Sequence, residues 1–330
     1  MKKKLKFLAC SLLLVFIVPC MFMLTGCGSN YTTISSKEYA KFLYASGTKY
    51  YDAHNGYSEF GNMTIASTFS VDGKYTEEVE YKENSTDTEY VVEDFTVELV
   101  ATCEEIVTIY NVGEGADAEL YIQITENSNS VTKGYRAAEE TETLEAYTET
   151  IIENTTHTFV KDGEEYRYYS VTTEKVDDEE ETVEKTYYTY ETSDAYEEAI
   201  SEFLYEIEVM LIGLFYPDSN AVLEISFCDS TYYKDGDKFG ATLEFANTSF
   251  DAGLGDYTYG KVDTTFVNSL PNQAKLTMEY AVEGEEVSQT SESNISYTAK
   301  AVSKPADTTG YELITDAPDV SFYGMGIGGQ

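Results

Sequence analysis

Alternation of apolar and polar residues along most of the chain is the feature that most restricts its fold. Residues 63–69, 120–124, 243–245, 274–280 and 295–299 place apolar side chains between Thr, Ser, Glu, Gln, Asn or Lys. Successive side chains of a strand point to opposite faces of a sheet, so this pattern indicates strands with one buried and one wet face. Such sheets are mostly antiparallel. We therefore predict an α+β protein that is mostly antiparallel sheet.

Short turn sequences separate the strand-like runs. They are Asp72-Gly73, Gly113-Glu114-Gly115, Asp162-Gly163, Asp235-Gly236 and Glu283-Gly284. These residue types tolerate the positive φ that tight hairpin turns need. We expect meanders of hairpins and no long crossovers.

A short helix is predicted near the start of the sheet region. Ser35 has the position of an N-cap and Glu38 that of its capping-box partner, while Ile34 and Tyr39 form a hydrophobic staple. We expect two or three turns that fray near Gly47.

A long amphipathic helix is predicted over residues 194–216, capped by Asp194 and stopped by Pro217. At 100° per residue, its apolar side chains fall within one arc. They are Ile200, Phe203, Leu204, Ile207, Leu211, Leu214 and Phe215. An arc this wide is expected to pack on the sheet.

The N-terminus reads as a bacterial export signal. Lysines at positions 2, 3, 4 and 6 precede an apolar run over residues 7–24. Leu24-Thr25-Gly26-Cys27 follows and resembles the bacterial lipobox. That resemblance implies a diacylglyceryl group on Cys27 and cleavage after Gly26. An ordinary cleaved signal and an uncleaved anchor are the alternatives, but neither needs small residues before a cysteine.

These signals divide the chain into four parts: a signal peptide over 1–26, a lipidated tether over 27–33, a β-rich domain over 34–303 and a loosely ordered tail over 304–330. No other stretch is long and apolar enough to cross a membrane, since the nearest one, 203–216, carries Glu206 and Glu208. We expect a lipid-anchored protein on the outside of a bacterial cell membrane of the Gram-positive type.

The charge of the chain restricts its partners. It has 60 acidic and 21 basic residues, for a formal net charge of −39. The only charged residues in the signal segment are lysines, so cleavage would make the net charge more negative. Nucleic acid and anionic lipid head groups are poor partners for such a surface. Solubility near a crowded envelope suffices as an explanation of the charge.

The sequence lacks the residue patterns of an enzyme or a metal site. Its two histidines, His54 and His157, are far apart in sequence, and no serine motif with an activating partner is present. The acidic run 177–181 has no calcium-loop spacing and reads as a hairpin tip, and Asp235-Gly236-Asp237 reads as a turn. We predict a non-enzymatic protein without metal or cofactor.

Cysteine and tyrosine each allow two interpretations. Cys103 and Cys228 could pair outside the cytoplasm or be small buried side chains. The chain has 30 tyrosines and no tryptophan. Tyrosines at 166–169 and 187–190 flank the acidic run, which predicts two hairpin partners whose rings pair across the sheet. A platform for glycans or a protein partner is the other interpretation.

The order of the elements resembles the half-barrel fold of the bacterial lipoprotein carriers, the LolA-like superfamily. In that fold a curved antiparallel sheet is closed on its concave side by helices. The resemblance covers residues 34–300 and implies that acyl chains are held between sheet and helix. It implies here a hydrophobic wall of Phe203, Leu204, Ile207 and Leu211, although these side chains would equally suit a plain packed core.

Two functions follow as expectations. The first is a membrane-anchored protein that binds or carries a lipid or another apolar molecule. The alternative is a surface interaction protein that presents Tyr-rich, acidic hairpins to a protein or cell-wall partner.

Overall fold

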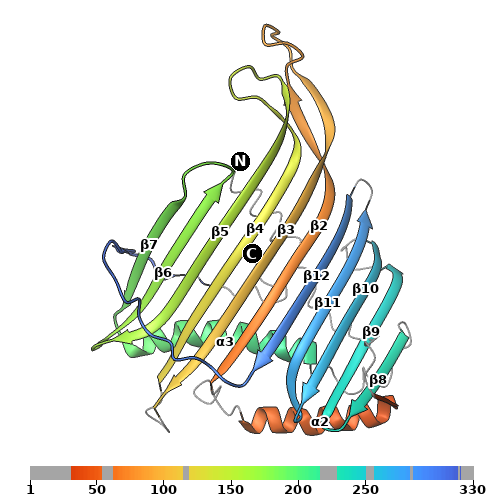
Figure 1. Ribbon diagram of the computed structural model, residues 1–330, viewed down its shortest axis with the longest axis vertical. Coiled ribbons are helices and arrows are strands. Elements are labelled where there is room, and N and C mark those ends of the chain that lie inside the picture. Colours follow the sequence, from red (N-terminus) through yellow and green to blue (C-terminus); the bar gives the residue numbers. More distant parts are fainter. Residues whose placement is uncertain are drawn as a thin grey trace.

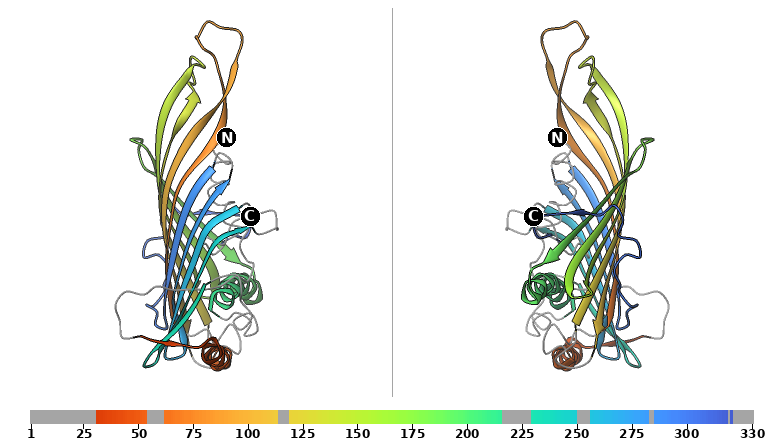
Figure 2. Two further views of the ribbon diagram at one scale, coloured as in Figure 1. Left: turned by 90° about the vertical axis from the view of Figure 1, so that its right-hand side faces the viewer. Right: turned by 90° about the vertical axis from the view of Figure 1, so that its left-hand side faces the viewer.

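The computed structural model describes residues 31–53, 62–113, 119–215, 229–249, 256–282, 285–318 and 320. Within them, thirteen strands form one large sheet with two helices against one of its faces (Figure 1). All strand pairs are antiparallel except the short pairing of β13 with β7. The prediction of an α+β protein built on a large antiparallel sheet is confirmed. Figure 2 shows that the sheet is curved, with both helices on its inner side.

The elements follow one another along the chain as two groups of strands, each preceded by a helix. The helices are α2 (Ser36–Ala53) and α3 (Ser193–Phe215). The strands are β1 (Thr32–Ile34), β2 (Met63–Tyr81), β3 (Val91–Val112), β4 (Glu119–Ala137), β5 (Leu144–Asp162), β6 (Glu165–Val176), β7 (Thr182–Tyr190), β8 (Asp229–Asp235), β9 (Lys238–Ser249), β10 (Asp256–Val267), β11 (Leu270–Val282), β12 (Glu285–Ser296) and β13 (Glu312–Leu313).

Two meanders make up the sheet. One runs from β2 to β7 and the other from β8 to β12, and β12 pairs with β2, so that the meanders join edge to edge. β1 extends the sheet at β8, and β13 extends it at β7. The predicted meanders are confirmed, and their joining through β12 and β2 is a feature that local turn signals could not supply.

The hairpin predictions had mixed outcomes. Asp162-Gly163 and Asp235-Gly236 form the β5–β6 and β8–β9 turns, with φ of 68° at Gly163 and 62° at Gly236. The prediction at Asp72-Gly73 was wrong, because β2 runs straight through both residues. A Cβ at Gly73 would lie 3.2 Å from Cγ2 of Val287 on β12, so this glycine permits close cross-strand packing. Residues 114, 115, 283 and 284 lie outside the described residues.

Helix α2 begins as predicted and is longer than predicted. The backbone N–H of Glu38 donates to Oγ of Ser35 at 3.2 Å, which confirms the N-cap. The helix passes Gly47, where we expected it to fray, and has 18 residues. Tyr39 and Leu43 are buried against the sheet, and Oγ of Ser46 donates to the carbonyl of Ser269 at 2.8 Å. These tertiary contacts offset the low helix propensity of glycine.

Helix α3 lies across the inner face of the sheet and covers its largest core. Its N-cap is Thr192, whose Oγ1 accepts from the N–H of Ala195 at 3.2 Å, so the prediction of Asp194 as the cap was wrong by two residues. Asp194 lies in the first turn, where a negative charge is also favourable. Pro217 lies outside the described residues.

The C-terminal segment contacts the outer face of the sheet and its β7 edge. Nζ of Lys304 donates to Asp162 at 2.6 Å, Val302 is buried with Val160 and Tyr169, and β13 pairs with β7. We expected a loose tail from residue 304, but the folded part of the chain extends at least to Ile314, whose N–H donates to the carbonyl of Tyr187 at 3.0 Å. The contacts that hold this segment come from strands distant in sequence.

The four longest strands curl at the end of the sheet away from the helices. The end of β2 meets the start of β5 there, where the Lys82 N–H donates to the carbonyl of Glu142 at 2.8 Å. The Lys82 ammonium forms an ion pair with Glu142, and the Tyr90 hydroxyl donates to the same carboxylate at 2.9 Å. We call these three side chains the tip clamp. Toward the helices from this clamp, Val79 on β2 and Val97 on β3 are buried.

Candidate functional site

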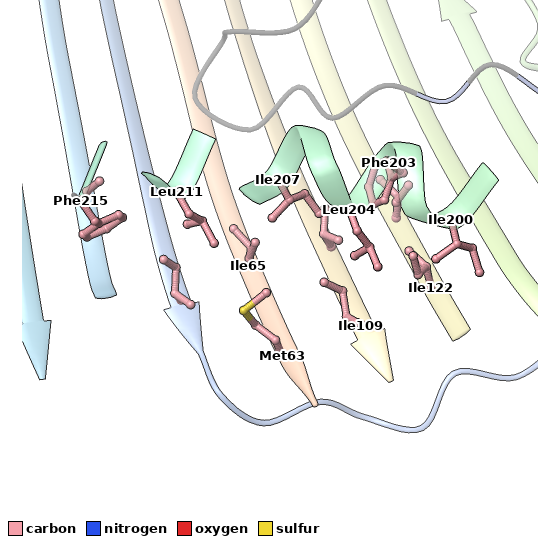
Figure 3. Close-up of a cluster of buried hydrophobic side chains, with 14 of the residues drawn as sticks. Met63, Ile65, Ile109, Ile122, Ile200, Phe203, Leu204, Ile207, Leu211 and Phe215 are labelled. Carbon is pink, nitrogen blue, oxygen red and sulfur yellow. The ribbon is translucent and has the colours of Figure 1, made fainter. Parts of the chain in front are cut away.

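The four side chains predicted as a ligand wall lie in the core between α3 and the sheet. Phe203 is 3% exposed, and Leu204, Ile207 and Leu211 are 0% exposed. Figure 3 shows them directed at the strands, close to Ile65, Ile109 and Ile122. A side chain that lines an open cavity keeps accessible area, so these four act as packing residues in the structure as it stands. Their contact with a ligand remains a prediction.

The same face of the sheet continues beyond this core toward the tip clamp. The cross-strand register places alternate residues of four strands on that face: those from Ser67 to Gly73, from Leu99 to Glu105, from Glu126 to Thr132 and from Glu149 to Thr155. We call these sixteen residues the inner band. They form four rows across β2, β3, β4 and β5, with the α3 core at one end and the tip clamp at the other.

The inner band carries five apolar side chains, in the three rows away from the α3 core. Phe69, Val71, Leu99, Ala101 and Ile151 are all only partly buried. They contrast with the α3 core, where side chains such as Ile109 and Ile122 have no exposed area. These partly exposed apolar side chains come from three of the band's four strands, β2, β3 and β5, while β4 contributes serine and threonine between them. On the inner side of a curved sheet they form a surface suited to an apolar ligand.

Carboxylates gather in the part of the inner band next to α3. Glu105 and Glu126 are directly opposite each other on β3 and β4, and Glu153 lies on the neighbouring β5. Glu105 is 2% exposed. Burial, and secondly the charge of Glu153, raises the pKa of Glu126 to about 7. Oε1 of Glu126 is buried, with no hydrogen-bond partner in the described part of the chain.

His157 adjoins these carboxylates on β5. Its Nε2 lies 3.9 Å from Oε1 of Glu126, and its Nδ1 lies 2.6 Å from the Tyr168 hydroxyl and 3.4 Å from Oγ of Ser170. Burial lowers the pKa of His157 to about 4, so the imidazole is neutral at pH 7. A neutral ring at 3.9 Å does not form an ion pair with Glu126. The cluster is therefore polar but contributes no positive charge.

Sequence analysis did not single out Glu105, Glu126 or His157. Their position in the alternation could have identified them, because Glu126 continues the inward-facing series 120, 122, 124 and Glu105 continues the series 109, 107. An acidic residue at an inward-facing position is unusual, since buried charges are costly. Within the described residues, no three His, Cys, Asp or Glu side chains are grouped as a metal site requires.

The tyrosine runs are hairpin partners, as predicted. Tyr166 pairs with Tyr190, Tyr168 with Tyr188, and Tyr169 with Tyr187. Tyr168, Tyr169 and Tyr190 are buried, and the Tyr188 and Tyr190 rings meet edge to face with centroids 5.0 Å apart. Half of these rings therefore serve packing. The acidic run lies in the exposed β6–β7 turn.

The two remaining sequence expectations concern residues that are partly or wholly outside the described ranges. Cys103 is a partly buried member of the inner band, but Cys228 is not described, so their disulfide remains a prediction. Cys27 and the signal segment also lie outside the described residues. No helix in the described ranges is long and apolar enough to cross a membrane.

Comparison with known proteins gives no family assignment. No family model matches the chain, and no curated protein sequence matches it. Among solved structures, an outer membrane channel from Pseudomonas putida F1 is similar over 72% of this chain and 96% of its own, with 8% identity and a TM-score of 0.23. The translocator domain of the autotransporter NalP from Neisseria meningitidis is similar over 79% of this chain and 99% of its own, with 10% identity and a TM-score of 0.16.

Proposed function

We propose that the protein is a non-enzymatic, lipid-anchored binding protein outside the cytoplasm, and that it holds a lipid or another apolar small molecule against the inner band. The observation that carries the proposal is the set of partly exposed apolar side chains on the inner face, led by Phe69, Leu99 and Ile151. Side chains that serve only as core would be expected to lose nearly all of their exposed area.

The proposed ligand site on the inner band lies farther along the sheet than the site under α3 that the sequence predicted. The half-barrel resemblance implied a ligand under α3, but Leu204, Ile207 and Leu211 already pack against the strands. The inner band lies beside that core on the same face, so α3 would border the ligand and not cover it. We interpret the curved sheet as a half-barrel whose ligand lies between α3 and the tip clamp.

Native mass spectrometry of the full chain, purified from bacterial membranes, tests this function. We expect a bound apolar molecule at about one per chain, released on denaturation. Leu99→Glu places a charge on the inner band and should abolish this binding, because a carboxylate is poorly tolerated against an alkyl chain.

Val100→Glu is the matched control, since Val100 is the next residue of β3 on the opposite face and is 49% exposed. It should bind as the unchanged protein does. Thermal unfolding of both variants establishes that each is folded. Loss of the ligand from both folded variants, or no ligand on the unchanged protein, would contradict the proposal.

A further inference from the structure

The charge of the inner band restricts the ligand further, and this inference rests on the proposed function. Four of the sixteen residues of the band are glutamates, at positions 105, 126, 149 and 153, and none is Lys or Arg. His157, next to the band, is neutral at pH 7 because burial lowers its pKa to about 4. An anionic head group would find carboxylates here and, among the sixteen residues of the band, no compensating cation.

Buried polar atoms without a hydrogen-bond partner are an independent observation at the same face. Ser291 on β12 pairs with Phe69, which places its side chain on the inner face beside the band. Ser291 is 0% exposed, and its Oγ has no hydrogen-bond partner in the described part of the chain. Oε1 of Glu126 is also buried without a partner. The Ser291 hydroxyl can donate or accept, and it lies three strands from Glu126, so it shows only that the inner face holds a second unpartnered polar atom. Oε1 of an ionised Glu126 can only accept, so its burial without a partner indicates a missing donor at the carboxylates.

We propose that the inner band selects an amphiphile with a protonated amine head group. Its alkyl chain would lie on Phe69, Leu99 and Ile151, and its ammonium group among Glu105, Glu126 and Glu153. The four rows of the band span about 20 Å along the strands. Glu105 and Glu126 lie in the row next to α3 and Glu153 in the following row, while Leu99 and Ile151 lie in the two rows toward the tip, where Glu149 is the one carboxylate of the band. An ammonium group brings three donors and no acceptor, which matches a surface of carboxylates and hydroxyls.

The state of Glu126 agrees with this assignment. Its pKa is raised to about 7 because the ionised carboxylate is buried and, secondly, is repelled by Glu153. A bound ammonium would favour the ionised form and supply the missing partner. Glu105 on β3, Glu153 and His157 on β5 and Tyr168 on β6 are the titratable groups that face Glu126.

Competitive photolabelling of the full chain in phosphatidylcholine nanodiscs tests the head-group preference. The reporter is decanol carrying a diazirine in its chain, and the competitors are decylamine, decanol and decanoate at pH 7. We expect decylamine to block labelling of inner-band peptides at a concentration about tenfold lower than decanol, with decanoate weakest. Glu126→Gln and Glu153→Gln should each reduce the advantage of decylamine at least threefold.

Glu104→Gln controls for general attraction between a cation and an acidic protein. Glu104 is the exposed neighbour of Glu105 on the outer face of β3, so this variant loses the same charge without changing the inner band. It should leave the advantage of decylamine unchanged. Equal competition by the three compounds, a preference for decanoate, or the same loss in Glu104→Gln would overturn the inference while leaving apolar binding intact. Absence of any labelling of the inner band would overturn the proposed function together with the inference.

Discussion

The carboxyl group of Glu126 lies where its surroundings disfavour the ionised form. Burial and the neighbouring Glu153 raise its pKa to about 7, whereas an unfolded chain would give about 4.5. The folded state therefore binds this proton more tightly than the unfolded state does. The resulting stability is fully present below pH 4.5 and is lost as the pH rises through 7. His157 has the opposite trend, because its lowered pKa costs stability as the pH falls from 6.5 toward 4.

We predict that Glu126→Gln becomes more stable relative to the unchanged protein by about 1 kcal/mol between pH 6 and pH 8. Glutamine imitates the protonated acid, so the variant does not lose stability when that proton leaves. The contribution of His157 is the same in both proteins and cancels in the comparison. Urea unfolding at the two pH values measures the difference, and a difference that is independent of pH would contradict the assignment.

The inner-band acids show what alternation can and cannot predict at single positions. The period of two assigned residues 120, 122 and 124 to one face, and the structure has them there with Glu126 in the same series. Alternation alone does not show which strand lies beside which. The cross-strand meeting of Glu105, Glu126 and Thr155 depends on register, which a single sequence does not supply.

At the scale of the elements, substitutions in α3 distinguish a packed core from a wall that contacts a ligand. Leu204 is 0% exposed and Tyr205, the next residue of the helix, is 58% exposed. We predict that Leu204→Ala lowers the free energy of unfolding by roughly 2 to 5 kcal/mol, because a well-packed leucine loses both transfer energy and contacts. Tyr205→Ala should change it by less than about 1 kcal/mol. Urea unfolding of both variants checks this.

A loss below about 1 kcal/mol at Leu204 would instead indicate that its side chain faces open space, as the ligand-wall interpretation requires. The sequence could not decide between these two possibilities. The apolar arc of α3 predicted that the helix covers a sheet, and Ile200, Phe203 and Leu211 are indeed buried. How closely the sheet approaches that arc depends on the curvature of strands far away in the sequence.

Turn chemistry predicted a hairpin correctly at two of the three Asp-Gly dipeptides in the described residues. Asp162-Gly163 and Asp235-Gly236 are hairpin turns, while the same dipeptide at 72–73 lies inside a strand of 19 residues. Glycine at 73 suits close packing between strands, because a Cβ there would lie only 3.2 Å from Val287 of β12. The sequence does not show that β2 and β12 are neighbours, so this contact could not be anticipated.

At the scale of the whole molecule, the pairing of β12 with β2 turns two meanders into one surface. The register runs from Ser296 opposite Thr64 to Glu286 opposite Lys74, so β12 pairs with the first half of β2. Beyond Lys74, β2 has β3 as its paired neighbour and curls toward β5 until Lys82 meets Glu142. One sheet is therefore broad where the helices pack and closed on itself at the tip, and the inner band lies between these two regions.

The position of this sheet in the cell depends on the N-terminus, which makes a separate prediction. If Cys27 is lipidated, the isolated protein should begin at Cys27, with the mass of diacylglycerol added and residues 1–26 absent. Cys27→Ser should keep residues 1–26 and gain no lipid, because the thiol is the attachment point that cleavage requires. Two acyl chains anchor a protein stably where one does not, so the unchanged protein should stay with the membrane through high-salt washing.

Cys20→Ser is the matched control, since Cys20 lies inside the apolar run and is not preceded by the lipobox residues. Intact-mass spectrometry should show it processed as the unchanged protein is. A chain cut at another residue, without lipid, would indicate an ordinary secretion signal and a protein released from the cell. That outcome would remove the membrane anchor from the proposed function but leave ligand binding by the inner band untouched, because the band is formed by residues 67–155 alone.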